Sequence, residues 1–138
     1  MSDVYVARHA MGERVQGLAL AAQDGFSARY DLDRKAGVFS RPQHALTGQS
    51  YVGKILVLDT AKGGVASAWM LGEMQSRGVV PLAIVLNSVN PILAQGAAFG
   101  GLTMLAGFDL DITSVVKSGD SIEIDPAAKT LRIVASRA

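Results

Sequence analysis

The chain of 138 residues contains no cysteine. Disulfide bonds, thiolate metal sites and cysteine nucleophiles supplied by this chain are therefore excluded. Charged residues make up only 18% of the sequence, the net charge is +1, and the basic residues are scattered rather than clustered. Proteins that bind nucleic acids through their phosphates need a basic stripe. We therefore expect no nucleic-acid partner.

Long hydrophobic runs are also missing. The apolar stretches are short and broken by Gly, Asn or Pro, so we expect no segment that spans a bilayer. The polar start, MSDVYVARHAMGERVQG, lacks the apolar centre of a signal peptide. We expect a cytoplasmic protein. The two histidines, His9 and His44, are far apart and have no carboxylate at metal-ligand spacing, so no metal site is expected in this chain.

The residues that are present predict one domain spanning 1–138. Hydrophobic residues make up 49% and the mean hydropathy is +0.28. This composition indicates a large core, or apolar surface that a partner covers. No linker, repeat or low-complexity tract divides the chain.

The middle of the chain alternates between strand-like and helix-like patterns. KILVLD (54–59) and PLAIVLN (81–87) are continuous apolar runs, typical of strands buried on both faces. Between them, 65–77 carries apolar residues at helical spacing, and Gly78 is a natural C-terminal stop.

Two more segments extend this alternation, and strand-like segments flank it. PILAQGAAFGG (91–101) predicts a short helix and LTMLAGF (102–108) a third strand. Residues 13–22 also resemble a strand, whereas 121–125 and 130–135 predict a hairpin joined by Pro-Ala-Ala-Lys.

Residues 25–50 lack sustained periodicity and are rich in turn formers. A loop of that length is uncommon in a compact domain unless it is functional or docked on something.

The order of these elements predicts an α/β fold. Right-handed crossovers make the middle strands neighbours in a partly parallel, mixed sheet with helices packed on one side. The flanking strands are expected to form a second β layer.

The glycine turn after the first buried strand is the clearest candidate binding feature. Gly63 and Gly64 allow close approach of a ligand to the backbone, the following helix N-terminus favours an anion, and Lys62 adds a positive charge. The sequence matches neither a P-loop nor a G-x-G-x-x-G fingerprint. A tight strand-to-helix turn with Lys62 in solvent is the alternative interpretation.

Two polar residues near this turn are further candidates. Ser67 lies one turn into the predicted helix, although a helix serine more often points to solvent or bonds a carbonyl one turn earlier. Asn87 ends a predicted strand, where α/β folds place ligand groups and where side-chain amides also commonly close turns.

Three motifs together carry a resemblance to a known family. They are R-P-x-H-x-L-x-G-x-S-x-x-G-K-I-L-V-L (41–58), KGGVAS (62–67) and RGVVPLAIVLN (77–87). In this order they resemble the small subunit of the aconitase X family, over roughly residues 10–135. The resemblance implies a swivelling β/β/α domain that closes over a large subunit carrying an iron–sulfur cluster. The absence of thiolate ligands agrees with a cluster on another chain.

The resemblance also implies a reaction and a set of site residues. Family activities are dehydrations of small hydroxy acids such as cis-3-hydroxy-L-proline or mevalonate 5-phosphate. The family turn G-R-G-S supplies a serine as general base, but Gly64 occupies that position here, and glycine cannot abstract a proton. Ser67 is the candidate catalytic residue that remains. The expected substrate-binding residues are Lys62, Gly63, Gly64, His44, Ser50 and Asn87.

Other interpretations stay open at this point. The base could come from the partner, or the chain could belong to a branch with a different substrate. A non-catalytic binding or regulatory subunit that lost the serine is the second functional hypothesis. A swivelling phosphohistidine domain is disfavoured, because GGVASAW has Ala68 where that family's histidine stands. In each remaining case we expect the isolated chain to be catalytically incomplete.

Overall fold

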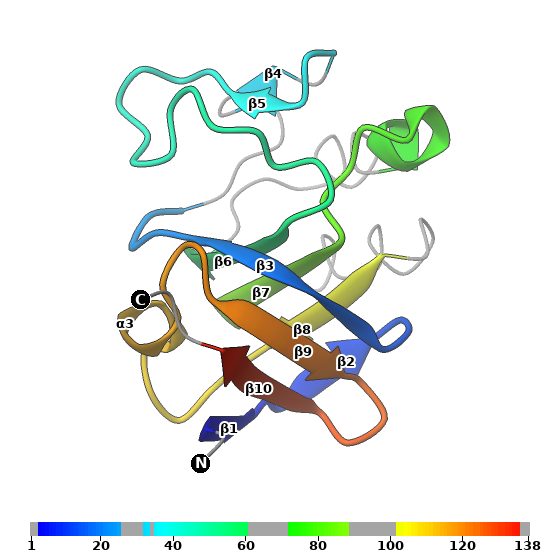
Figure 1. The fold of residues 1–138 in the computed structure, drawn as a ribbon, viewed down its shortest axis with the longest axis vertical. Coiled ribbons are helices and arrows are strands. Elements are labelled where there is room, and N and C mark those ends of the chain that lie inside the picture. Colours follow the sequence, from blue (N-terminus) through cyan, green and yellow to red (C-terminus); the bar gives the residue numbers. More distant parts are fainter. Residues whose placement is uncertain (1–2, 26–31, 34, 61–71, 89–101, 136–138) are drawn as a thin grey trace.

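An eight-stranded sheet forms the body of the molecule (Figure 1). The computed structural model describes residues 3–25, 32–33, 35–60, 72–88 and 102–135. The strand order is β1-β10-β9-β3-β6-β7-β8-β2. These strands are β1 (Asp3–Val6), β2 (His9–Met11), β3 (Val15–Ala21), β6 (Ile55–Thr60), β7 (Ala83–Ser88), β8 (Thr103–Ala106), β9 (Ser121–Asp125) and β10 (Thr130–Ala135).

Strand β3 joins two halves of this sheet. Its first part, Val15 to Leu18, pairs antiparallel with β9, whereas Ala19 to Ala21 pair parallel with β6. Strands β6, β7 and β8 continue in parallel from there. The sequence-based expectation of a mixed sheet with parallel middle strands is confirmed.

The two halves of the sheet pack face to face around a buried apolar core. One side of β6, β7 and β8 meets the inner side of β9 and β10. The core residues from these strands are Ile55, Val57, Ala83, Val85, Leu105, Ile122, Ile124, Leu131 and Ile133. The predicted second β layer is therefore present, although hydrogen bonds through β3 make the two layers continuous.

A second core lies on the opposite face of β6 and β7. Here the side chains of the sheet contact the irregular segment before β6 and the helical residues 72–77. The larger members of this core are Leu56, Leu58, Ile84, Leu86, Met104, Phe39, Leu46, Tyr51 and Met74. The result is a β/β/α arrangement in which part of the third layer is loop rather than helix (Figure 1).

The predicted strands and the C-terminal hairpin are present. Residues 72–77, the end of the predicted 65–77 helix, are helical, and Gly78 follows with a φ of +72° as expected of a C-terminal stop. The remainder of that helix, and the predicted helix 91–101, lie outside the described residues. Within 25–50, the short strands β4 (Leu32–Asp33) and β5 (Val38–Phe39) form a hairpin that periodicity did not predict.

Three further short elements were not predicted individually. Strands β1 and β2 hold the two edges of the sheet, by pairing with β10 and β8. Helix α3 (Ile112–Val115) begins at Asp111, whose side chain accepts the Thr113 N–H as an N-cap. Its β-branched sequence favours a strand, and the cap together with burial of Ile112 outweighs that preference. None of the described helices is long and apolar enough to cross a bilayer.

Candidate functional site

The carboxyl ends of β6 and β7 lie at the same edge of the sheet, which we call the carboxyl edge. Strand β6 ends at Thr60 and β7 at Ser88, and the two residues pair in register. Open α/β sheets bind ligands at this kind of edge. The glycine turn follows directly in the sequence. The Cα atoms of Thr60 and Gly64 can therefore be at most about 15 Å apart, the length of the extended chain between them.

Four predicted site residues, Lys62, Gly63, Gly64 and Ser67, lie outside the described residues. Their roles remain predictions.

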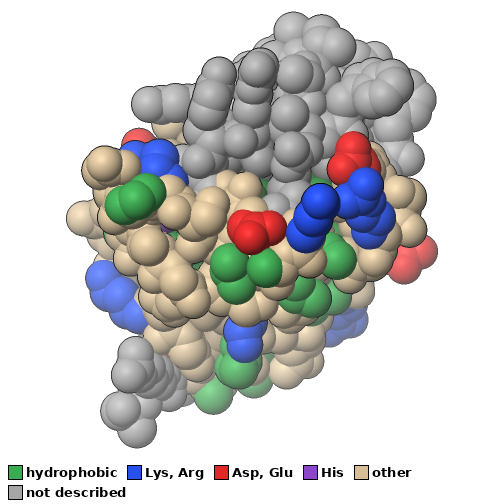
Figure 2. Space-filling view, turned by 90° about the horizontal axis from the view of Figure 1, so that it is seen from above, with side chains coloured by type: hydrophobic (Ala, Val, Ile, Leu, Met, Phe, Trp, Pro, Cys, Tyr) green, Lys and Arg blue, Asp and Glu red, His purple; other side chains and the backbone are tan. Residues whose placement is uncertain are grey.

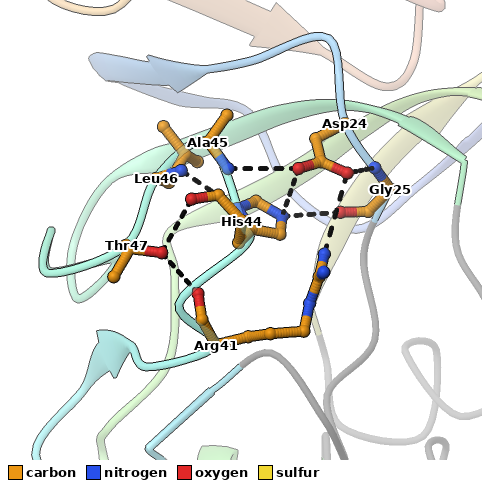
Figure 3. A network of polar contacts seen from close by, with 7 residues as sticks. All are labelled: Asp24, Gly25, Arg41, His44, Ala45, Leu46 and Thr47. Carbon is orange, nitrogen blue, oxygen red and sulfur yellow. Dashed lines mark hydrogen bonds and ion pairs between the residues drawn. The ribbon is translucent and has the colours of Figure 1, made fainter.

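One polar cluster at this edge is centred on Asp24 (Figure 3). It comprises Asp24, Gly25, Arg41, His44, Ala45, Leu46 and Thr47, and we call it the Asp24 cluster. The Asp24 carboxylate accepts N–H groups from Gly25 at 2.8 Å and from Ala45 at 3.1 Å. The backbone oxygen of Asp24 accepts the N–H of Asp59, one residue before the end of β6, at 2.9 Å. Asp24 therefore connects β6 to the turn at 41–47.

His44 is buried in this cluster, with 3% of its surface exposed. Its Nδ1 accepts the Leu46 N–H at 3.0 Å, and its Nε2 lies 2.8 Å from the Gly25 carbonyl oxygen. Because Nδ1 accepts, the proton sits on Nε2, which donates to Gly25. The ring also stacks on Phe39, with centroids 4.6 Å apart. The ring that sequence analysis assigned to substrate binding thus contacts protein groups through both nitrogens.

The groups around Asp24 favour its ionised form. Burial opposes ionisation, but hydrogen bonds from Ala45 and Gly25 and the nearby His44 and Arg41 outweigh it, so that the pKa of Asp24 lies below its usual value. Both Nε2 of His44 and Nη2 of Arg41 are 3.8 Å from an Asp24 oxygen.

The turn that carries these two side chains is closed by a hydroxyl group. The Thr47 hydroxyl contacts the carbonyl oxygens of Arg41 and His44. The 41–47 turn therefore presents Arg41 and His44 to Asp24 as one unit.

A second polar cluster lies on the other face of the carboxyl edge. It comprises Asp59, Asn87, Asp111, Ile112 and Thr113, and we call it the Asn87 cluster. The Asn87 amide nitrogen donates to Asp59 at 2.9 Å and to Asp111 at 2.8 Å, and its oxygen accepts the Ile112 N–H at 2.8 Å. Asn87, predicted to bind substrate, thus fastens the start of α3 to the ends of β6 and β7.

Asp111 is held ionised by the same contacts. Hydrogen bonds from the Thr113 hydroxyl and the Asn87 amide lower the pKa of Asp111, against a smaller opposing effect of burial. The Thr113 hydroxyl lies 2.6 Å from this carboxylate.

The remaining polar candidates are hydroxyl groups. Ser88 donates to the Thr60 hydroxyl oxygen at 3.1 Å, which joins the ends of β7 and β6 on the face that carries the Asp24 cluster. Ser50, predicted to bind substrate, is exposed, and its hydroxyl oxygen accepts the Val52 N–H at 3.3 Å. Its backbone forms a bridge with Val38.

The structure thus brings His44 and Asn87 to the two faces of one sheet edge. Sequence analysis missed the acidic residues Asp24, Asp59 and Asp111, which connect them to the fold. Asp24 and Asp59 each follow or end a strand-like run in the sequence. Asn87 was predicted from the same kind of position, so this signal could also have identified the two acidic residues. No sequence pattern relates Asp111 to Asn87.

The described residues provide no evident metal or cluster site. No group of three or more His, Asp or Glu side chains within the described ranges is arranged to hold a metal ion. The chain also has no cysteine. On the face seen in Figure 2, the Lys and Arg side chains of the described residues lie at several places, and acidic side chains lie near some of them.

Known proteins resemble this chain over nearly its whole length. The sequence model of the aconitase X swivel domain matches residues 4–133. A phosphomevalonate dehydratase small subunit from Thermococcus sibiricus is 31% identical over 118 residues, which cover 86% of this chain and 88% of that protein. A protein of the same name from Methanocella arvoryzae is 27% identical over 122 residues, covering 88% of this chain and 92% of that protein.

Solved structures share the fold. The crystal structure of Thermococcus kodakaraensis aconitase X in its holo-form superposes with a TM-score of 0.88 at 23% identity, covering 96% of this chain and 98% of that one. A UPF0107 protein determined by solution NMR gives a TM-score of 0.85 at 24% identity, covering 96% of this chain and 99% of the other. With a family match over 4–133 and relatives aligned along most of both lengths, this chain belongs to the aconitase X swivel-domain family, a family of dehydratase subunits.

Proposed function

We propose that this chain is the small subunit of a hydro-lyase that dehydrates a small hydroxy acid, in an active site shared with a large subunit that carries an iron–sulfur cluster. The relatives named as phosphomevalonate dehydratase small subunits support the subunit role and make a phosphomevalonate-like acid the first substrate to test. A cis-3-hydroxy-L-proline-like acid is the second. The cytoplasm is the proposed location.

The donor set of this chain does not fit an iron–sulfur cluster. Such clusters are held mainly by cysteine thiolates, and this chain has none. The described residues also offer no cluster of three His, Asp or Glu ligands. Both observations support a cluster on the large subunit.

The observation that carries the proposal is the convergence of polar groups on the carboxyl edge, where the sequence runs on into the glycine turn. Dehydration removes a proton from one carbon and hydroxide from its neighbour, leaving a double bond and water. For this chain we propose that Lys62 and the N–H groups of Gly63 and Gly64 bind the anionic group of the acid. Ser67 is the candidate proton acceptor, because Gly64 has no side chain.

Reconstitution of the two subunits tests this proposal. We expect the purified chain alone to give no turnover of phosphomevalonate or cis-3-hydroxy-L-proline, and the pair to dehydrate one of them. Lys62→Gln should raise KM about tenfold or more, the cost of one charged contact. Lys35→Gln, which removes an exposed lysine in the β4–β5 turn, is the matched control. Turnover by the chain alone would contradict a shared active site.

The same assay separates the second candidate function, a non-catalytic binding or regulatory subunit. Gly64 favours that alternative, because the family serine is missing at this position. Ser67→Ala should lower kcat at least tenfold if Ser67 accepts the proton. Ser76→Ala removes an exposed hydroxyl from the helical residues 72–77 and serves as control. Unchanged turnover in both Lys62→Gln and Ser67→Ala would favour the non-catalytic role.

A further inference from the structure

Asp24 occupies a central position at the carboxyl edge. Its backbone oxygen receives the Asp59 N–H from β6, and its carboxylate receives the Ala45 N–H from the 41–47 turn. Just before it, the Ala22 N–H donates to the Val57 carbonyl oxygen at 3.1 Å, so residues 22–24 run alongside the end of β6. One residue thus holds two segments that are distant in sequence at a fixed separation.

The contacts of Asp24 require a carboxylate. Oδ1 accepts the Gly25 N–H and Oδ2 accepts the Ala45 N–H, so each oxygen serves a different donor. An asparagine has one oxygen and one NH₂ group, and it can satisfy only one of these donors. The charge matters as well, because the Arg41 guanidinium faces the carboxylate from the same turn.

We call the contacts by which Asp24 joins the 41–47 turn to the end of β6 the Asp24 junction. Its position in the sheet relates it to the proposed reaction. Asp59 and Thr60 are the last two residues of β6, and the sequence enters the glycine turn at the next residue. Thr60 also accepts the Ser88 hydroxyl, which ties the end of β7 to the same point. A displacement of about 1 Å between groups that act on one substrate is enough to lower a rate about 100-fold.

We propose that Asp24 is a positioning residue for the dehydration. It joins the 41–47 turn to the end of β6 and so fixes the arrangement of the carboxyl edge against the substrate. Asp24 does not touch the substrate in this account. The inference rests on the proposed function for its effect on turnover, but the junction itself is a property of this chain alone.

Asp33 offers a matched control within the same irregular region. Its carboxylate also accepts two backbone N–H groups, from Lys35 at 3.0 Å and Ala36 at 3.1 Å, in the β4–β5 turn. Hydrogen bonds from Ala36 and Lys35 lower the pKa of Asp33, as the corresponding bonds do for Asp24. Both donors lie in the β4–β5 turn, so replacing the Asp33 carboxylate should disturb a similar turn without loosening the carboxyl edge.

The test compares Asp24→Asn with Asp33→Asn in two settings. In the reconstituted pair, with the large subunit at saturating concentration, Asp24→Asn should lower kcat/KM 10- to 100-fold, whereas Asp33→Asn should stay within about twofold of wild type. In the isolated chain, NMR should show the amide signals of Ala45, Asp59 and Thr60 shifted by Asp24→Asn alone. On acidification of the wild type, these signals should titrate together with a pKa below that of an ordinary Asp.

Measurements on the reconstituted pair and on the isolated chain separate failure of the positioning role from failure of the proposed function. Equal loss of turnover in both variants, or an Asp24→Asn enzyme as fast as wild type, would overturn the positioning role. Failure of the wild-type pair to dehydrate any hydroxy acid would count against the proposed function instead. In that case the NMR comparison decides, because unshifted Asp59 and Thr60 signals in Asp24→Asn would overturn the junction itself.

Discussion

On one face of the carboxyl edge, Asn87 lies between two carboxylates and accepts the first N–H of α3. On the other face, Asp24 lies between two N–H donors, with Arg41 and His44 beside it. The central residue is therefore neutral in one cluster and charged in the other, although Asp and Asn have the same shape. Asn87→Asp should destabilise its cluster by adding a negative charge between two others. Asp24→Asn should destabilise the other cluster by removing a negative charge that the N–H donors and Arg41 require.

The two clusters also differ in what they hold. The Asn87 cluster attaches α3, whose Ile112 is fully buried in the core between the two β layers. The Asp24 cluster attaches the 41–47 turn, in which His44 and Leu46 are buried. Leu46 packs into the second core, and His44 stacks on Phe39, which belongs to that core. We therefore expect changes at Asn87 to affect mainly global stability, and changes at Asp24 to affect mainly the arrangement of the edge.

The largest effect should come from Asn87→Asp. This change removes both donated hydrogen bonds and adds a third carboxylate between Asp59 and Asp111, so the free energy of unfolding should fall by about 3 kcal/mol at neutral pH. The negative neighbours raise the pKa of the new carboxyl group in the folded state. The loss should therefore shrink as the pH falls through that raised pKa.

Urea unfolding at several pH values measures this effect. Gln49→Glu makes the same amide-to-carboxylate change at an exposed position and should alter stability by less than about 0.5 kcal/mol. A loss in Asn87→Asp that does not depend on pH would contradict the electrostatic account.

An intermediate effect is expected from His44→Phe. The new ring can still stack on Phe39, but the bond to Gly25 is lost and the buried Leu46 loses the acceptor for its N–H. An unsatisfied buried donor costs about 2 kcal/mol. The matched change His9→Phe, at an exposed site on β2, should cost much less. Equal stability of the two variants in thermal unfolding would show that the His44 hydrogen bonds contribute nothing.

The smallest effect concerns acid stability and Asp111. Because the folded state lowers the pKa of Asp111, its ionised form stabilises the fold above the ordinary Asp pKa, and this contribution is lost as the pH falls through the lowered value. Asp24 behaves in the same way. Asp111→Asn should make the free energy of unfolding less dependent on pH in the acid range. Superimposable curves for variant and wild type would contradict this prediction.

The fold was predictable where burial leaves a pattern in the sequence. Strands β6 and β7 appear as continuous apolar runs because both of their faces are covered, and β9 and β10 alternate because only one face is. Strands β1 and β2 are too short to show a period, and they form because β10 and β8 offer free edges.

The candidate site was only partly predictable, for a related reason. His44 and Asn87 could be identified from a family motif and from the end of a strand. Their partners Asp24 and Asp111 lie far away in the sequence. Only the folded sheet brings Asp111 within hydrogen-bonding distance of Asn87, and Asp24 to 3.8 Å from His44. The sequence therefore indicated candidate residues but not their contacts, and both side chains prove to be bonded to the protein itself.

The most direct test of the account is hydrogen–deuterium exchange of this chain with and without its large subunit. If the carboxyl edge meets the partner and the substrate, peptides covering 41–60 and 83–88 should gain protection on assembly, and the β9–β10 hairpin at 121–135 should not. Protection confined to the hairpin, with 41–60 and 83–88 unchanged, would contradict it.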